Sequence, residues 1–427
     1  MLGVNGVVGA GIFLLPGRIA HLAGGLSWAV YLGCASLCFL IGLCYAEMGS
    51  RYQGTGGAYL YARDAYGPFL GFLVGWIVWL SAVLGWTSLS VGFADALGRL
   101  VSPVFHEPWG RAVAVTGLVG GLSIVNLRGA RVGAMANNLF SVLKLLPLAL
   151  FVGLGAFHVE GSPFALEPHW RGFDDLHGVL LWGLFLYSGF EEVGVPAGET
   201  RDPQHTVPRA VLIVLGSATL VYMLVQLIAQ AAFPGLGDAD KAPLADAAQF
   251  FLGSAGLTLV GAGTLVSLLG TNTSIAFTGP RSLFALAADG YVSPRLAAID
   301  GHRHAPSAAI IVTGLLVVML PLVDMLGFEQ VTLEHLVRLS ALATLLQYIS
   351  TCAAVLLMRA RKEETAPAFR APGGAALPLV ALALAVLLVA LAPRRDQLMT
   401  LMGVALGLPV WWMSRGATSR PEAPPRT

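Results

Sequence analysis

The chain has 427 residues, of which 56% are hydrophobic and 11% charged, and its mean hydropathy is +0.74. A soluble enzyme of this length needs far more charge to cover its surface. A formal net charge of +1, without a basic stripe interleaved with aromatic residues, argues against a nucleic-acid-binding protein. The apolar residues form blocks long enough to cross a lipid bilayer, so the sequence predicts an all-α integral membrane protein.

Apolar blocks bounded by charged or Pro/Gly-rich stretches predict about twelve membrane helices, and the closeness of the last two pairs leaves eleven open. Lys and Arg are more frequent in the loops on the side of the two termini, so we expect a multi-pass protein of the cell membrane with both termini cytoplasmic. The predicted spans are 2–22, 26–47, 69–98, 111–127, 137–157, 178–196, 208–232, 257–287, 307–323, 333–359, 375–392 and 397–414.

The first apolar block contains the stretch GVVGAGIFLLPG (Gly6–Gly17), whose glycines and proline weaken a helix. A broken helix is tolerated in a membrane where its freed backbone groups are buried in protein or line a cavity. Such a break offers N–H donors and C=O acceptors, which an amino acid needs for its carboxylate and its ammonium. We therefore expect an interruption at Gly9 and Gly11 facing a central cavity. Close helix packing by small residues is the alternative.

The fifth block places a lysine, Lys144, among apolar residues. A charge at membrane depth normally faces a cavity or a partner. We expect its ammonium to donate to backbone carbonyls of the broken first helix, near Gly6 to Gly9, where it could also carry a coupling proton. Snorkelling to the cytoplasmic headgroups is the alternative.

The sixth block contains a second flexible point, Ser188-Gly189-Phe190-Glu191, with carboxylates at membrane depth. It is the fifth block after the first, and two interrupted helices at matching positions of two halves indicate a transporter site. We therefore expect one transmembrane domain over 1–415: repeat one over about 1–158, repeat two over about 178–360, and two further helices over about 375–414. The tail 416–427 is expected to be a short disordered cytoplasmic segment.

Several features bear on other functions. Glu191 and its neighbour Glu192 would point about 100° apart on a helix, so at most one is expected to face the cavity. No nucleophile accompanies them, and no Cys or His set has metal-ligand spacing, so we expect no catalytic residues, metal or cofactor. The four cysteines indicate packing rather than a disulfide-linked partner subunit. Few residues precede the first glycine cluster, so we expect the natural chain to begin before Met1.

Four motifs together resemble those of amino-acid permeases of the amino acid–polyamine–organocation superfamily. The stretch GAGIFLLPG is similar to the family's G-[SA]-G-I-F motif, and the longest resemblance covers the loop between the second and third blocks. The matching segments are Gly9–Gly17, Tyr45–Trp76, Tyr187–Ala210 and Leu268–Pro294. The resemblance implies a 5+5 inverted-repeat fold similar to the bacterial leucine transporter, with alternating access.

The resemblance also implies residue roles. The substrate carboxylate would meet backbone N–H groups around Gly9, Ala10 and Gly11. The ammonium would meet carbonyls near Val7 and around Phe185, Ser188 and Gly189. Phe185 matches an aromatic gate, Glu191 an acidic gating position, Ile275 a side-chain pocket, and Lys144 the lysine of many sodium-independent members.

The chain departs from the family pattern at Ala10, which replaces a serine, and the apolar Phe185 and Ile275 favour a neutral substrate. We therefore expect a secondary transporter of neutral amino acids, working by sodium-independent exchange or proton symport. A polyamine or cationic amino-acid antiporter is the alternative, and it would need more acidic groups in the cavity. An amino-acid sensor on a transporter scaffold is the alternative from another class, and a membrane enzyme is disfavoured.

Overall fold

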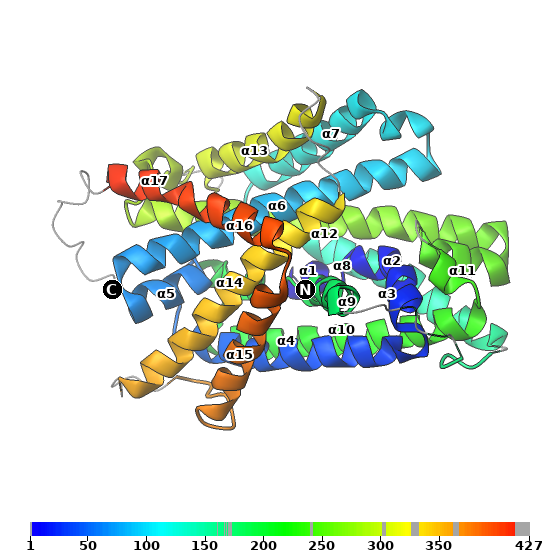
Figure 1. Ribbon diagram of the computed structural model, residues 1–427. Coiled ribbons are helices and arrows are strands. Elements are labelled where there is room, and N and C mark those ends of the chain that lie inside the picture. Colours follow the sequence, from blue (N-terminus) through cyan, green and yellow to red (C-terminus); the bar gives the residue numbers. More distant parts are fainter. Residues whose placement is uncertain are drawn as a thin grey trace.

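The computed structural model describes residues 2–159, 161–165, 167, 169, 173–239, 242–300, 305–325, 333–361 and 367–414. All regular secondary structure in these ranges is helical (Figure 1). The expected tail 416–427 lies outside the described residues.

The first part of the chain builds a broken leading helix and four longer helices. Its helices are α1 (Leu2–Val7), α2 (Gly11–Leu14), α3 (Pro16–Ala23), α4 (Ser27–Gly49), α5 (Ala58–Tyr66), α6 (Pro68–Leu100), α7 (Pro108–Leu127) and α8 (Ala130–Gly155).

The second part begins with α9 (Phe173–Tyr187), which passes into a short 3₁₀ helix, η4 (Phe190–Gly194). The helices that follow are α10 (Pro203–Ala232), α11 (Pro243–Leu252), α12 (Ser254–Ala288), α13 (Ser307–Met325), α14 (Leu333–Ala360), α15 (Ala376–Leu391), α16 (Arg394–Ala405) and α17 (Gly407–Ser414).

The observed helices differ from the predicted spans at several ends. The span 178–196 stops being an α-helix at Tyr187, and two loops contain short helices, α5 and α11, that were not predicted. The span 208–232 begins earlier, because Pro203 takes the first helical position, where a missing N–H costs nothing. The span 137–157 also begins earlier, at Ala130, directly after Gly129 with its φ of 117°. The early start of α10 lies in the polar stretch PQHTVPR, which hydropathy does not mark.

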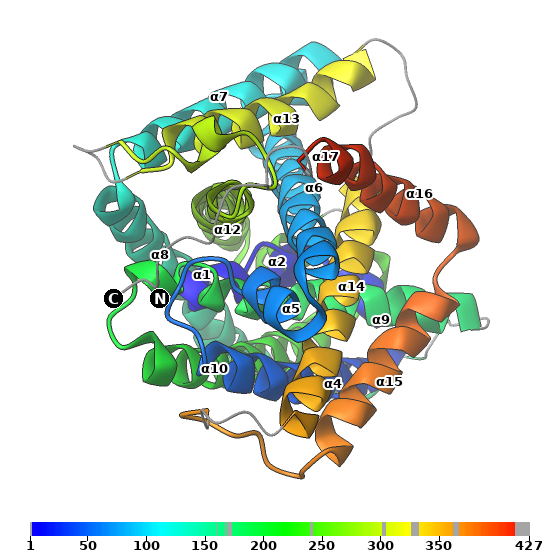
Figure 2. The ribbon, with the colours of Figure 1, turned by 90° about the vertical axis from the view of Figure 1, so that its left-hand side faces the viewer.

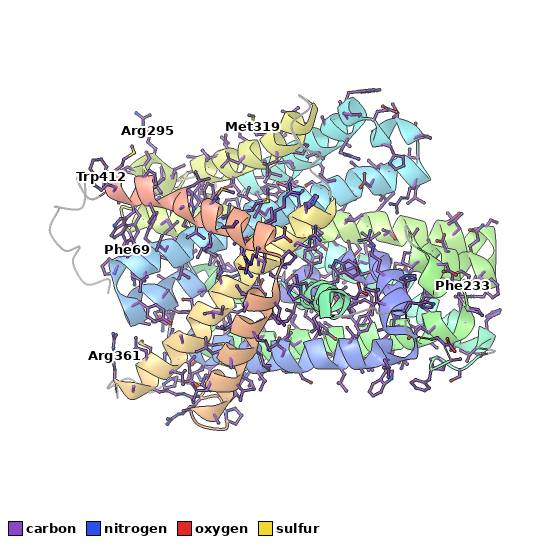
Figure 3. All side chains as sticks on the ribbon, in the orientation of Figure 1. Phe69, Phe233, Arg295, Met319, Arg361 and Trp412 are labelled. Atoms are coloured by element: carbon purple, nitrogen blue, oxygen red, sulfur yellow. The ribbon has the colours of Figure 1, made fainter. Side chains whose placement is uncertain are left out.

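Eight helical spans in the described residues are long and apolar enough to cross a membrane. Three shorter apolar stretches, Leu2–Leu14, Ser307–Leu322 and Ala376–Leu391, add to them. Large apolar side chains also point outward, among them Trp412 at 76% exposure and Met319 at 52% (Figure 3). Exposed apolar side chains of this kind suit contact with lipid tails.

The broken helices occupy the middle of the bundle. In Figure 2, α1 and α2 lie at the centre, with α12 and α6 on one side and α10 and α4 on the other. Helix α1 packs against α8, α10, α12 and η4. Both chain interruptions are therefore enclosed by protein, the setting in which irregular backbone is tolerated within a membrane.

Candidate functional site

The first interruption lies where the glycine cluster predicts it. Helix α1 ends at Val7 and α2 begins at Gly11, while the Gly9 N–H donates to the Val7 carbonyl at 2.6 Å. Neither Gly9 nor Gly11 adopts a positive φ. Instead, a Cβ at Gly11 would lie 2.7 Å from Leu186 Cδ2. A side chain at Gly11 would therefore have to displace the Leu186 side chain of the second broken helix.

The second interruption follows α9 and packs directly against the first. Gly189 adopts a φ of 113°, which disfavours any residue with a Cβ, and η4 begins at the next residue. A Cβ at Gly189 would lie 2.8 Å from the carbonyl carbon of Gly6. The two breaks thus meet backbone to backbone, although about 180 residues of chain separate them.

Tyr222 of α10 connects the two broken helices. Its hydroxyl contacts the Val7 carbonyl oxygen and, at 2.9 Å, the Leu186 carbonyl oxygen. A tyrosine hydroxyl has one hydrogen to donate, so it can fully satisfy only one of the two carbonyls at a time. The other carbonyl remains able to accept a hydrogen bond from a bound cationic group.

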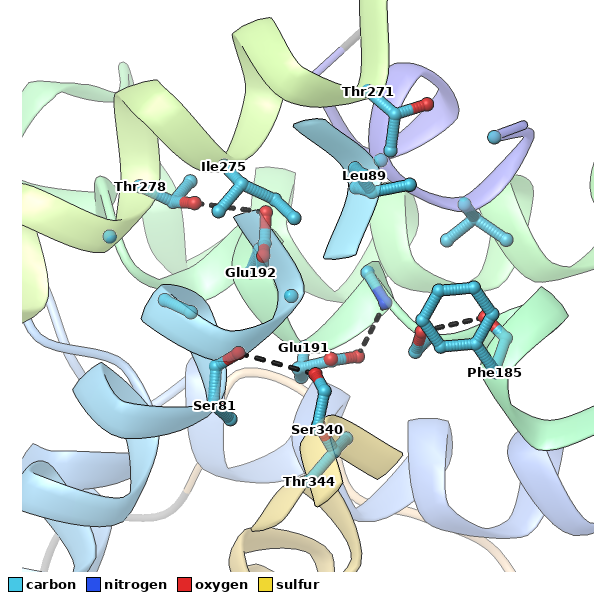
Figure 4. A pocket seen from close by; sticks show the side chains of 18 of the residues that line it. Ser81, Leu89, Phe185, Glu191, Glu192, Thr271, Ile275, Thr278, Ser340 and Thr344 are labelled. Atoms are coloured by element: carbon cyan, nitrogen blue, oxygen red, sulfur yellow. Dashed lines mark hydrogen bonds between the residues drawn. The ribbon is translucent and has the colours of Figure 1, made fainter. Parts of the chain in front are cut away.

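A cavity of about 70 Å³ lies between the broken helices and α6, α12 and α14 (Figure 4). We call it the central cavity. All the residues that the sequence assigned to the substrate line it, together with the expected gating residue Glu191. These lining residues are Val7, Gly9, Ala10, Gly11, Phe185, Ser188, Gly189, Ile275 and Glu191.

The expectation that at most one carboxylate faces the cavity is wrong, because Glu191 and Glu192 both line it. The two side chains still diverge, as adjacent residues of the short 3₁₀ helix must, but the cavity extends around this turn and both carboxylates reach it. Glu191 accepts from the Gly189 N–H at 2.9 Å and from the Tyr348 hydroxyl at 2.8 Å. Glu192 accepts from the Thr278 hydroxyl at 2.9 Å. Figure 4 shows the two side chains pointing to different sides of the cavity.

Lys144 lies behind the first break and is not among the residues that line the cavity. It is completely buried, and its Nζ donates to the carbonyl of Asn5 at 2.5 Å. The acceptor therefore precedes the expected range Gly6 to Gly9 by one residue. Asn5 is within the last turn of α1, whose carbonyls have no partner within the helix. The snorkelling conformation is not the one in this structure.

Asn5 makes further contacts from the same position. Its side-chain N–H groups donate to Asn137 Oδ1 and to the Gly270 carbonyl, both at 2.7 Å. The last turn of α1 is thereby attached to α8 through Lys144 and Asn137, and to α12 through Gly270. These contacts fix the end of α1 from behind, through residues that do not line the central cavity.

Sequence reasoning missed the polar residues that α12 and α14 contribute to the cavity lining. On α14, Ser340, Thr344 and Gln347 recur at intervals of four and three, which places them on one helical face. On α12, Thr271 and Thr278 flank Ile275 with the same periodicity. This spacing is visible in the sequence and could have been found. Tyr222 and Tyr348 carry no such signal, because each is one aromatic residue in an apolar helix.

The described residues contain no group of three or more His, Cys, Asp or Glu side chains that could hold a metal ion. The polar groups at the breaks are backbone amides and carbonyls, hydroxyls and two carboxylates. Such an arrangement can bind a small molecule that carries both an anionic and a cationic group.

A family model described as amino acid permease matches residues 1–411. The chain is 28% identical to human cationic amino acid transporter 4 over 85% of this chain, and covers 59% of that protein. It spans about three-fifths of the length of the human and mouse proteins of that name.

Two relatives from Bacillus subtilis (strain 168) are covered more fully. Identity to the branched-chain amino acid permease BcaP is 25%, over 90% of this chain and 84% of the relative. Identity to the methylthioribose transporter is 24%, over 97% of this chain and 91% of the relative. These names differ in substrate, while the similarity extends over nearly the whole chain.

Proposed function

The chain belongs to the amino acid permease family, and on this premise we propose that it is a secondary transporter that moves neutral amino acids across the cell membrane by alternating access. Its mode is sodium-independent exchange or proton symport. It is a multi-pass membrane protein, and the bilayer and a small-molecule substrate are its partners.

The observation that carries this proposal is the meeting of two interrupted helices at one cavity. We expect the substrate carboxylate to bind backbone N–H groups at Gly9, Ala10 and Gly11. We expect its ammonium to bind the carbonyls that share the Tyr222 hydroxyl, those of Val7 and Leu186. Because each break leaves backbone groups without helical partners, a zwitterion supplies what both breaks lack.

The substrate side chain is proposed to lie against Ile275, Leu89 and Phe185, which give the central cavity apolar walls. A neutral side chain suits these walls. The alternative of a cationic amino acid or amine is favoured by one observation, the presence of both Glu191 and Glu192 in the lining. Similarity to a protein named as a cationic amino acid transporter supports the cationic alternative. Similarity to a protein named as a branched-chain amino acid permease supports a neutral substrate.

The finer architecture is also part of the proposal. We infer twelve membrane helices arranged as repeat one over about 1–158, repeat two over about 178–360, and two further helices over about 375–414. The interrupted α1–α2 and the interrupted α9–η4 would begin the two repeats, as inverted-repeat transporters require.

Both termini are proposed to be cytoplasmic. Loops assigned to that side by their basic residues contact one another: Arg63 pairs with Asp289 at 2.6 Å, and Arg361 donates to the Asp64 carbonyl at 3.1 Å. Arg295 and Arg361 lie at the same end of the molecule, and Phe233 lies at the other (Figure 3). This grouping is consistent with the positive-inside rule.

Uptake into proteoliposomes tests the proposal. A panel of radiolabelled amino acids, with L-leucine and L-arginine as the first comparison, would be measured with and without a pH gradient and sodium. We expect leucine to enter without sodium and to be competed by other neutral amino acids. Competition in which arginine or a polyamine outcompetes every neutral amino acid would favour the cationic alternative, and strict sodium dependence would contradict the proposed mode.

A further inference from the structure

The wall that α14 contributes to the central cavity contains two buried polar side chains whose hydrogen-bonding groups are free. Thr344 and Gln347 line the cavity, and they are 7% and 3% exposed. Within the part of the chain that the structure describes, no residue exchanges a hydrogen bond with either side chain. Buried polar groups in folded proteins are normally paired. A free amide and a free hydroxyl at the edge of a cavity therefore indicate that a ligand completes them.

The Gln347 amide sets a specific requirement for that ligand. It offers two N–H donors on its nitrogen and one acceptor on its oxygen. An ammonium or guanidinium group has no acceptor, an ionised carboxylate has no donor, and a hydrocarbon has neither. A hydroxyl is a single atom and meets the amide at one of its two ends. A carboxamide donates and accepts at once, so two amides can pair through two reciprocal N–H···O contacts.

The neighbouring polar groups of the lining are acceptors. The Ser340 hydroxyl donates to the Ser81 carbonyl at 3.2 Å, and the Ser81 hydroxyl donates to the Val78 carbonyl at 2.9 Å. A hydroxyl has one hydrogen, so both retain only lone pairs for a ligand. Glu191 and Glu192 add carboxylate oxygens. This surplus of acceptors suits a group that brings two N–H donors.

Gly85 of α6 leaves room for a side chain between an apolar and a polar wall. It lines the cavity, and a Cβ there would lie 3.2 Å from Ser340 Oγ and 3.6 Å from Ile275 Cδ1. Ser340, Thr344 and Gln347 share one face of α14 and extend over about 10 Å of its axis. Figure 4 shows Ser340 and Thr344 at the same wall of the cavity. A side chain passing Gly85 would contact Ile275 with its methylene groups and α14 with its end.

We propose that the central cavity selects neutral amino acids with a carboxamide side chain, as in glutamine and asparagine, and that Gln347 and Thr344 determine this specificity. The Gln347 amide pairs with the carboxamide through both of its ends, and the Thr344 hydroxyl donates to the carboxamide oxygen. This inference rests on the proposed transport function and narrows its substrate class.

Charge separates the carboxamide from side chains of similar shape. The described residues that line the central cavity include Glu191 and Glu192 but no lysine or arginine. The carboxylate of a glutamate side chain would meet like charge there, which is unfavourable. A cationic side chain would find the two carboxylates but would leave the N–H groups of Gln347 unpaired. A carboxamide satisfies the amide and the acceptors together.

The first test is competition for radiolabelled L-leucine on the purified full chain, read by scintillation proximity. The unlabelled competitors are L-glutamine, L-methionine, which is also unbranched but has no donor in its side chain, and L-glutamate, which has the same shape with a charge. We expect the Ki of methionine to be about tenfold above that of glutamine, the scale of one or two net hydrogen bonds. The Ki of glutamate should be about a hundredfold above it.

The second test repeats the competition with variants of α14. Gln347→Met keeps an unbranched side chain without the amide, and the ratio of the methionine Ki to the glutamine Ki should fall from about ten to about one. Thr344→Val, a milder change, should lower the ratio about threefold. Gln249→Met, at an exposed glutamine of α11, is the matched control and should keep the ratio near ten. Monodispersity and thermal unfolding would check that each variant folds.

The inference and the proposed function fail in different ways. Leucine binding with equal Ki values for glutamine and methionine would overturn the carboxamide preference and leave the transport function standing. A glutamate Ki equal to that of glutamine would do the same. A ratio near ten in both α14 variants would overturn the roles of Gln347 and Thr344, because a merely structural role would weaken all ligands alike. Displacement of leucine by arginine or a polyamine better than by every neutral amino acid would overturn both proposals.

Discussion

The two interrupted helices reach similar geometry by different means. The first break has no positive φ and is held from behind, where Lys144 and Asn137 contact Asn5. The second break is made locally, by Gly189 at a φ of 113° and by the Glu191 carboxylate that accepts the Gly189 N–H. The first break therefore depends on contacts between distant helices alone, whereas the second also has a local cause in the residues Ser188–Glu191 themselves. Substitutions should affect the two breaks through different partners.

The largest effect is expected for Gly11→Leu, at the start of α2. A Cβ alone would lie 2.7 Å from Leu186 Cδ2, and the remaining side chain would intrude on the central cavity that Gly11 lines. Substrate binding should fall to background, while the unfolding temperature falls by only about 5 °C, as overpacking typically costs. Scintillation proximity binding and a thermal melt would measure the two quantities.

Gly117→Leu is the control for that prediction, because no atom lies within 4 Å of a Cβ at Gly117 on α7. It should bind and transport as the unaltered protein does. Normal binding by Gly11→Leu would show that the first break does not border the substrate.

Gly189→Ala is expected to come next. The positive φ and the 2.8 Å approach to Gly6 should together destabilise the protein by about 2 kcal/mol and displace one break against the other. Gly253 has a φ of 63° but no atom within 4 Å of a Cβ. Gly253→Ala therefore measures the cost of backbone strain without a steric clash. Thermal unfolding and uptake by both variants would be compared. Equal losses in the two would mean that the contact between the breaks is unimportant.

Lys144→Ala should affect the first break alone. Without the ammonium, the Asn5 carbonyl loses its donor, and an unpaired buried polar group of this kind costs about 1–3 kcal/mol. We expect transport to fall about tenfold with expression nearly unchanged. The pH profile of flux, measured with and without sodium, distinguishes a proton-carrying lysine from a fixed cation. If Lys144→Ala leaves the transport rate and its pH profile unaltered, Lys144 takes no part in transport.

The smallest effect is expected for Tyr222→Phe, which tests the connection between the breaks. Loss of one hydroxyl removes a donor shared by Val7 and Leu186, and should change Kd about fivefold. If the substrate ammonium competes with this hydroxyl, affinity should rise; if the hydroxyl only positions the carbonyls, affinity should fall. Isothermal titration would decide, with Tyr31→Phe on α4 as the control. No change at all would exclude both roles.

Hydropathy predicted an all-helical membrane protein, and the glycine clusters predicted where two of its helices break. Hydropathy, glycine clusters and isolated charges are local signals, because lipid imposes internal hydrogen bonding on every uninterrupted span. Gly9, Gly11, Gly189 and Lys144 were therefore identifiable without a structure. The early start of α10 was missed because its first turns are polar.

Which side chains meet at the breaks is visible only once the helices are packed together. Tyr222 reaches both broken helices from α10, Glu192 meets the hydroxyl of Thr278 on α12, and Asn5 joins α1 to α8 and α12. Such meetings depend on how helices pack across long sequence separations, which neither hydropathy nor helix propensity encodes.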